Sequence, residues 1–316
     1  MRLVINPIVF RISGETPQVL LTDGGQLPEV PYEPDEHTNA ERYVSSYLDT
    51  NYRIKAAQVH QAHMATSTWR QEKSQQCGLS FLILTKSRNS KKGQWVNLYD
   101  LLPWEDWREG EPGICMSTIT PQLSRWQEQE WAQKEQSSRQ LECNVLFAQG
   151  AHQWLERLAH ERYRLLFKAG LLEEAHLAHD ICDKKCPMIE RADMDSSLLK
   201  SQAKRMGQAL PKDNRLHIAF ALTRLRELLL STPVLTHLTS STFTLTRLQK
   251  TVEAISGINM HKNNFRRLLH NMDIIEETDE MVSPVRGRPA QLFKFKDDLD
   301  RSAPLSGLGH LPRSVA

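Results

Sequence analysis

Apolar residues recur at three- and four-residue steps in two neighbouring stretches near the C-terminus. This spacing places them on one face of a helix and predicts one helix over 245–256 and another over 260–272. Thr244 and Asn259 are placed to cap the two N-termini, and Gly257 to end the first helix. A short turn then joins two helices. The apolar positions are Leu245, Leu248, Val252 and Ile255 in the first stretch and Phe265, Leu268, Leu269 and Met272 in the second.

Two short runs of strand character follow these helices. Ile274–Thr278 and Gln291–Phe295 have the length and β-forming residues of strands, and the second alternates apolar and basic positions. The segment between them contains Gly287 and Pro289. Two helices followed by a two-stranded wing predict a winged helix-turn-helix.

The polar face of the second predicted helix is basic. From Asn259 through Met272 the chain has three Lys or Arg residues and no acid. Clustered cations bind duplex phosphates through counterion release, while amide and guanidinium groups can contact base edges. We therefore expect double-stranded DNA as the partner; the alternative is a plain solvated helix face. The expected DNA-binding residues are Thr244, Lys250, Lys262, Asn263, Asn264, Arg266 and Arg267, with Arg286 and Arg288 on the wing.

Overall composition sets wide limits. The 316 residues are 40% hydrophobic and 25% charged, with a net charge of +2, so DNA binding is suggested by local charge and not by the global balance. No apolar run reaches membrane-spanning length, and the N-terminus lacks a signal-peptide pattern. Five cysteines form an odd set without framework spacing. We expect a soluble, cytoplasmic protein with no membrane partner.

The N-terminal part predicts a mixed α/β domain over 1–124. The stretches 3–12 and 17–22 and the apolar run 79–85 indicate strands, and 40–51 indicates a helix with Tyr43, Tyr47 and Leu48 on one stripe. The segment 98–112, which follows, is both acidic and aromatic. We expect Trp104 to pack in the core, while Trp107 and Arg108 are candidates for binding an effector by stacking and phosphate contact, or for packing beneath a loop.

The sequence pattern divides the rest of the chain into a helical section, the winged helix domain and a tail. Residues 125–212 predict a mostly helical section, helical over 143–172 and polar over 191–213, which could carry a homodimer interface. The winged helix domain would then span 213–298. The Gly- and Pro-containing tail 299–316 predicts disorder. The expected fold class is α+β.

Four potential zinc ligands lie close together in the middle section. His179, Cys182 and Cys186 would share one face of a helix, with His176 nearby. Structural zinc sites draw ligand pairs from two separate turns, and Pro187 ends this stretch. Ordinary polar and small apolar roles are therefore the preferred interpretation, with no metal expected.

The opening order of strand, hairpin, LPEVPYEPDEH loop and helix resembles a Nudix domain. The Nudix box carries several Glu residues that hold divalent metal ions for hydrolysis. Aligned on the helix after the loop, its Arg and Glu positions fall on Ser45, Ser46, Asp49 and Thr50, so one carboxylate remains. A single Asp does not hold a catalytic magnesium site. We expect no enzyme activity and no catalytic residues, in a domain able to hold a nucleotide.

The two halves together resemble the Nudix-related transcriptional regulators of NAD metabolism, of the NrtR and NadQ types. The stretches that carry this resemblance are LPEVPYEPDEH, LLPWEDWREGEP, LLFKAGLLEEA, FTLTRLQKTVEAISG, HKNNFRRLL and GRPAQLFKF. The resemblance implies a homodimeric repressor of NAD-biosynthesis genes. It implies no cofactor, only an adenine or nicotinamide nucleotide as effector. The alternatives are an active Nudix-type nucleotide hydrolase and an adaptor whose winged helix binds another protein.

Overall fold

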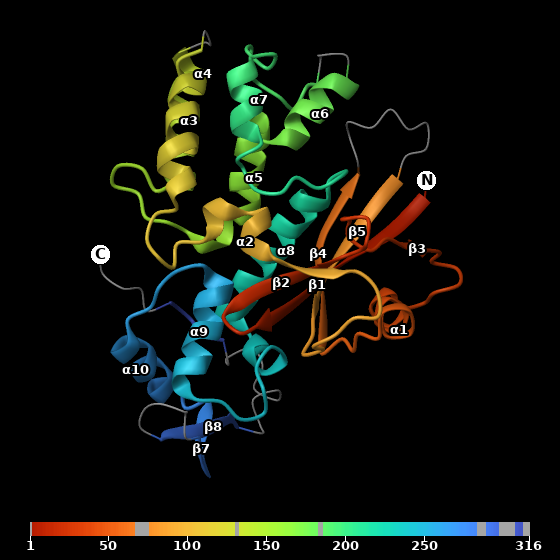
Figure 1. Ribbon diagram of the computed structural model, residues 1–316, viewed down its shortest axis with the longest axis vertical. Coiled ribbons are helices and arrows are strands. Elements are labelled where there is room, and N and C mark those ends of the chain that lie inside the picture. The colour runs from red at the N-terminus through yellow and green to blue at the C-terminus, as the bar shows by residue number, and fades with distance from the viewer. Residues whose placement is uncertain are drawn as a thin grey trace.

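The computed structural model describes residues 2–66, 76–129, 133–182, 186–282, 289–296 and 307–311. Along its longest axis, helices α3 to α7 gather at one end and a winged helix unit forms the other, with a β-sheet and the helix α8 between them (Figure 1). The arrangement is mixed α and β, as the sequence predicts.

The strands and helices alternate irregularly along the chain. The strands are β1 (Arg2–Ser13), β2 (Thr16–Leu21), β3 (Val30–Tyr32), β4 (Gln58–Thr66), β5 (Gln76–Leu84), β6 (Gln94–Asn97), β7 (Ile275–Val282) and β8 (Ala290–Phe295). The α-helices are α1 (Ala40–Tyr52), α2 (Leu98–Leu101), α3 (Thr120–Gln127), α4 (Gln133–Leu146), α5 (Ala159–Lys168), α6 (Glu173–Ile181), α7 (Ser197–Ala203), α8 (Asn214–Ser231), α9 (Leu245–Ser256) and α10 (Lys262–Met272). Short 3-10 turns occupy Pro103–Glu105, Glu156–Leu158 and Val234–His237, and a π-helical turn occupies Cys115–Ile119.

The N-terminal sheet is buried on both faces. Its strand order is β4-β5-β1-β2-β6, with β3 also paired to β1; β1 and β5 run parallel and the other pairs antiparallel. Along β1, Ile5 and Val9 face the cluster beneath α1, whereas Ile8 and Phe10 face the opposite side. A strand buried on both faces needs apolar residues at consecutive positions, which explains the apolar run 81–84 in β5.

One hydrophobic core joins the sheet to the C-terminal helices. The sheet face formed by Ile8 and Leu82 belongs to the same buried cluster as Leu248 of α9 and Phe265 of α10. Helix α8 connects them, because it contacts β1, β4 and β5 on one side and α9 on another. The winged helix is therefore packed onto the rest of the chain.

The middle section is broken where the sequence predicts continuous helix. The chain leaves α4 after Leu146 and resumes a helix only at Ala159, with Trp154 buried in the connection. The polar 191–213 stretch contains α7. Its Arg191 is buried and donates to Gln122 Oε1 at 2.9 Å, so this polar side chain makes a hydrogen bond inside the protein.

Residues 307–311 of the tail, for which the sequence predicts disorder, contact the end of α8. Leu308 is buried, and its backbone N–H donates to Leu229 O at 3.0 Å, while Gly309 N–H donates to Leu230 O at 2.9 Å. The last carbonyls of a helix lack partners within the helix. These residues supply hydrogen bonds near the C-terminal end of α8, together with an apolar side chain.

Two kinds of feature are missing from the described part of the chain. None of its helices combines the length and the apolar character that a bilayer crossing needs. It also holds no cluster of three or more His, Cys, Asp or Glu side chains arranged for a metal ion. Helix α6 ends at Ile181, so Cys182 caps it and Cys186 lies beyond its end.

Candidate DNA-binding face and its attachment

The first helix of the pair, α9, begins and ends as the sequence predicts. Thr244 caps it, with the side chain accepting a hydrogen bond from Arg247 N–H at 3.2 Å. Gly257 ends it with a φ of 74°, a left-handed conformation that favours glycine. Both capping predictions are confirmed.

The turn between α9 and α10 is held by a buried carboxylate. Glu253 is 2% exposed, and its Oε1 accepts from Met260 N–H at 3.0 Å, while Gln249 Nε2 donates to Met260 O at 2.9 Å. Its other oxygen pairs with Lys250 Nζ at 3.0 Å, and this bond raises the pKa of Lys250. Lys250, expected at the DNA interface, is thus engaged within its own helix.

The second helix, α10, starts later than predicted. Its N-cap is His261, which makes no side-chain capping bond, and the expected capping role of Asn259 is wrong. The reason lies in Met260, whose amide and carbonyl are both bonded to side chains of α9. A residue held in this way cannot join the helical ladder, so the helix begins at Lys262.

The two faces of α10 separate as its pattern predicts. Phe265, Leu268 and Leu269 are buried against the core. The side chain of Asn264 is half-buried and accepts from Arg267 Nη2 at 3.3 Å. Those of Lys262, Asn263, Arg266 and Arg267 are exposed. The structure therefore brings together all five predicted polar residues of this helix, on a surface without carboxylates from the helix itself.

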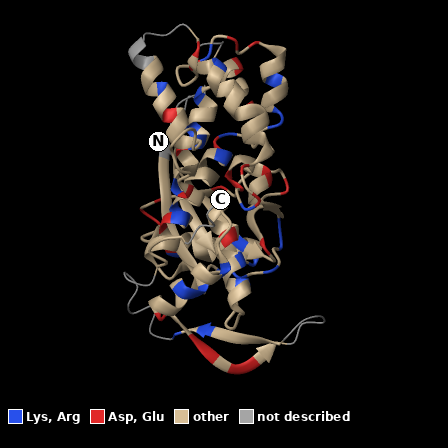
Figure 2. Ribbon diagram, turned by 90° about the vertical axis from the view of Figure 1, so that its left-hand side faces the viewer, with Lys and Arg blue, Asp and Glu red and all other residues tan. Residues whose placement is uncertain are grey.

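The strands after α10 form an antiparallel hairpin of mixed charge. Phe243 pairs with Phe293 through two backbone hydrogen bonds and joins the hairpin to the start of α9. Figure 2 shows acidic residues gathered along β7, and Lys294 of β8 pairs with Glu276 at 2.8 Å. The wing residues Arg286 and Arg288 lie outside the described residues.

The end of α9 is attached to the segment that follows α2. Trp107 N–H donates to Gly257 O at 2.6 Å, and Tyr99 Oη donates to Ala254 O at 2.9 Å. The approach at Gly257 is so close that an added Cβ would lie 2.2 Å from Glu105 O. The helix-turn-helix is thus fixed to the N-terminal part of the chain at its turn.

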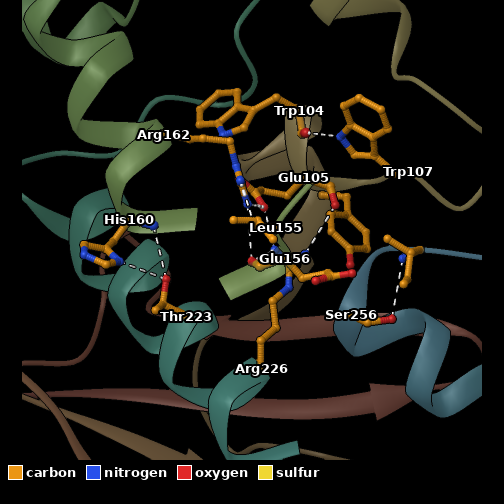
Figure 3. Close-up of polar contacts among 12 residues, drawn as sticks. Trp104, Glu105, Trp107, Leu155, Glu156, His160, Arg162, Thr223, Arg226 and Ser256 are labelled. Atoms are coloured by element: carbon orange, nitrogen blue, oxygen red, sulfur yellow. Dashed lines mark hydrogen bonds and ion pairs between the residues drawn. The ribbon is translucent and has the colours of Figure 1, made fainter. Parts of the chain in front are cut away.

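Behind this attachment lies a buried ion cluster (Figure 3). Glu105 accepts from Arg162 Nε at 2.6 Å and Arg162 Nη2 at 2.8 Å, and from Arg226 Nη1 at 2.5 Å. Arg226 Nε also donates to Ile255 O at 3.0 Å, which reaches the last turn of α9. Burial alone would raise the pKa of Glu105, but the two guanidinium groups outweigh it and hold that pKa below its usual value. The sequence gives no signal for this cluster.

The two effector candidates have partners inside the protein. Trp107 packs against Trp154 with the rings tilted by 30° and their centroids 4.3 Å apart, and its Nε1 donates to Trp104 O at 3.0 Å. The guanidinium of Arg108 donates two hydrogen bonds to Asp106, at 2.7 and 2.8 Å. Trp104 is fully buried, as predicted. The packing alternative left open for Trp107 therefore agrees with its contacts, and its effector role stays a prediction.

The helix that corresponds to the Nudix box packs on the sheet. Asn39 caps α1, and Val44, Leu48 and Tyr52 are its buried residues, so the buried stripe is shifted by one position from the predicted Tyr43 and Tyr47. Of the residues that fall on the box, Asp49 is exposed. The remaining positions are Ser45, Ser46 and Thr50, which cannot replace carboxylate ligands.

Comparisons with known proteins agree with this arrangement. Residues 236–295 match the family described as NrtR DNA-binding winged helix domain. The chain is 35% identical over 108 residues to the ADPR responsive transcriptional repressor NtrR of Acinetobacter baylyi; this stretch is 34% of the chain and 42% of that protein, less than half its length.

Solved structures extend the likeness to the whole fold. NrtR of Shewanella oneidensis in complex with a 27mer DNA superposes with a TM-score of 0.53 at 15% identity, covering 96% of this chain and 97% of that one. The same protein without DNA gives 0.53 at 14% identity, covering 96% and 98%. That NrtR contains a Nudix domain. Residues 236–295 therefore match an NrtR-type winged helix domain, and the chain as a whole shares the fold of that NrtR.

Proposed function

We propose that this protein is a DNA-binding transcriptional repressor that controls NAD-biosynthesis genes in response to a nucleotide such as ADP-ribose. The observation that carries the proposal is the exposed face of α10, where Lys262, Arg266 and Arg267 stand beside two Asn side chains without an acid on the helix. Such a face suits the major groove, where guanidinium and amide groups contact base edges. The NAD part rests on the sequence resemblance, and the effector part on the ADPR response of the Acinetobacter relative.

The same proposal makes the Nudix-like domain a sensor and not a hydrolase. Support comes from α1, where the box positions retain only Asp49 as a carboxylate. The repressor would act as a homodimer, because two recognition helices together read a symmetric operator. Exposed leucines on the helical section support a contact between copies there; they are Leu141 of α4, Leu177 of α6 and Leu198 of α7.

The decisive test is DNA binding by a variant of the α10 face. In Arg266→Ala with Arg267→Ala, binding to a duplex from the protein's own upstream region should weaken at least about tenfold, and the salt dependence should become shallower. Fluorescence anisotropy over a salt series measures both. Lys204→Ala with Arg205→Ala is the matched control, because this exposed pair lies just after α7 and removes the same charge. Equal affinities of the α10 variant and the unmodified protein would refute the proposal.

A further inference from the structure

A concave site lies between the N-terminal sheet and the first helix of the winged helix. Its cavity has a volume of about 500 Å³ and is lined by the turn after β1, by the loop after β5 and by residues that begin the winged helix. Four lining residues carry charge, and all are cations: Arg11, Lys86, Arg88 and Arg247. The lining has no carboxylate.

Within the described part of the chain, none of these four cations forms an ion pair with an Asp or Glu side chain. Lys86, Arg88 and Arg247 are exposed to solvent at the cavity. Like charges gathered around one cavity repel each other, and an anion placed among them relieves this repulsion. A larger cavity between α5 and α8 is not lined by cations alone, because Glu161 and Glu190 are among its lining residues.

The cationic site is held in place before any ligand enters. Arg11 donates from Nε to Gln18 Oε1 at 2.8 Å and from Nη1 to Ser87 O and Arg88 O, and its guanidinium packs 3.9 Å above the ring centroid of Trp95.

The loop that carries Lys86 and Arg88 is also fixed. Thr85 Oγ1 donates to Lys55 O at 2.7 Å, and Ser87 N–H donates to Thr85 Oγ1 at 3.0 Å. The backbone of this loop is therefore held in position before a ligand binds, which lowers the ordering cost of binding.

The polar character of the lining identifies the part of a ligand that it would contact. Besides the cations it offers the hydroxyl groups of Ser13 and Ser87, and it has no aromatic side chain. The other lining hydroxyls donate to backbone carbonyls; they belong to Thr85, Thr239, Ser240 and Thr251. Bases are held by stacking on aromatic rings, whereas phosphates are held by cations and by hydroxyl and amide donors. Arg247 also lies in the first turn of α9, where the helix dipole favours an anion.

We propose that this cavity binds a phosphate ester through Lys86, Arg88 and Arg247, with Arg11 holding the loop in position. The phosphate has two sources of the same chemistry. One is the backbone of a duplex bound by α10, because the first helix of a helix-turn-helix crosses the backbone. The other is a free phosphorylated ligand, which would then touch the sheet and the winged helix at once. Only the first source rests on the proposed function.

The test uses the full chain carrying Lys86→Ala and Arg88→Ala, beside the unmodified protein and the Lys204→Ala with Arg205→Ala control. Sodium pyrophosphate is titrated by calorimetry, and a random-sequence duplex is titrated by anisotropy over a salt series. A free-phosphate site predicts pyrophosphate binding at least about tenfold weaker in the loop variant alone, since a charge-assisted hydrogen bond commonly contributes that much. A backbone site predicts that the salt slope for the duplex becomes shallower by about 2, one for each lost phosphate contact.

Each result decides the question. The proposal is overturned if the loop variant matches the unmodified protein in both titrations, or if the control loses as much as the loop variant. If the unmodified protein binds no duplex, the proposed function fails, and the pyrophosphate titration alone then decides whether the cavity binds phosphate.

Discussion

Arginines in the interior of this protein are matched by carboxylates, whereas those on α10 have no acid beside them. Arg162 and Arg226 converge on Glu105, and Arg215 donates to Glu174 at 2.6 Å, with all of these side chains nearly inaccessible. On α10 the only side-chain partner within the helix is Asn264, which Arg267 contacts. The interior arginines hold parts of the chain together, whereas the charges of the exposed arginines remain available to bind an anionic partner.

The difference shows what a guanidinium does when its surroundings change. A buried guanidinium loses its water, so it needs a carboxylate and several carbonyls to remain charged. Arg226 obtains these from Glu105, Ile255 and Glu156, which lie in three separate segments. An exposed guanidinium keeps its water and contributes little to stability. Substitutions in the buried cluster and at the exposed surface test this difference.

The largest effect is expected from Glu105→Gln. This change keeps the size of the side chain but leaves Arg162 and Arg226 without their buried counter-charge, and we expect a loss of about 3–5 kcal/mol in the free energy of unfolding. Urea denaturation measures it. Glu227→Gln is the control, because Glu227 pairs with Arg224 at the exposed surface and should cost less than about 1 kcal/mol. Similar losses in both variants would mean that the buried cluster is not the stronger contact.

A smaller effect is expected from Gly257→Ala. Gly14 provides a matched control, since both glycines have a left-handed backbone but only Gly257 lacks room for a Cβ. The left-handed conformation should cost each variant about 1–2 kcal/mol, and the clash with Glu105 O should cost Gly257→Ala about 1–3 kcal/mol more. Urea denaturation of the two variants isolates the clash. If they lose equal stability, the turn of the helix-turn-helix is not tightly held by the Glu105 segment.

The smallest effect on stability is expected from the protonation of partly buried histidines. Burial lowers the pKa of His60, His63 and His160, so the unfolded chain binds more protons than the folded chain just below the ordinary histidine pKa of about 6.5. Stability should therefore be full above that pH and fall as the pH drops towards the folded-state values. Urea midpoints between neutral and mildly acidic pH test this. His160→Gln should flatten the decline, and an unchanged profile would argue against a neutral buried His160.

Local patterns were sufficient to predict the helix pair. The apolar spacing of α9 and α10, the cap at Thr244 and the left-handed Gly257 each depend on neighbours a few residues away. The start of α10 could not be predicted in this way. It depends on Glu253, whose side chain reaches Met260 across the turn, and a Glu on a helix ordinarily indicates a solvated position.

The buried cluster was hidden from the sequence for a related reason. Arg226 stands in the stretch RLREL, whose charges look like those of an exposed helix face. Its partner Glu105 lies 121 positions away, and only the packing of α8 between sheet and winged helix brings the two together. The cationic cavity was also hidden from the sequence, because Arg11, Arg88 and Arg247 come from three segments that lie far apart along the chain.

The continuous core described above restricts how a bound nucleotide would alter affinity for an operator. Within one copy of the chain, the recognition helix and the sheet share one buried core that includes Ile8 and Phe265, so a movement of one against the other would disrupt that core. In a homodimer, the spacing between the two recognition helices would then change through rotation of whole copies against each other. A small displacement where the copies meet would be carried undiminished to the grooves of the DNA.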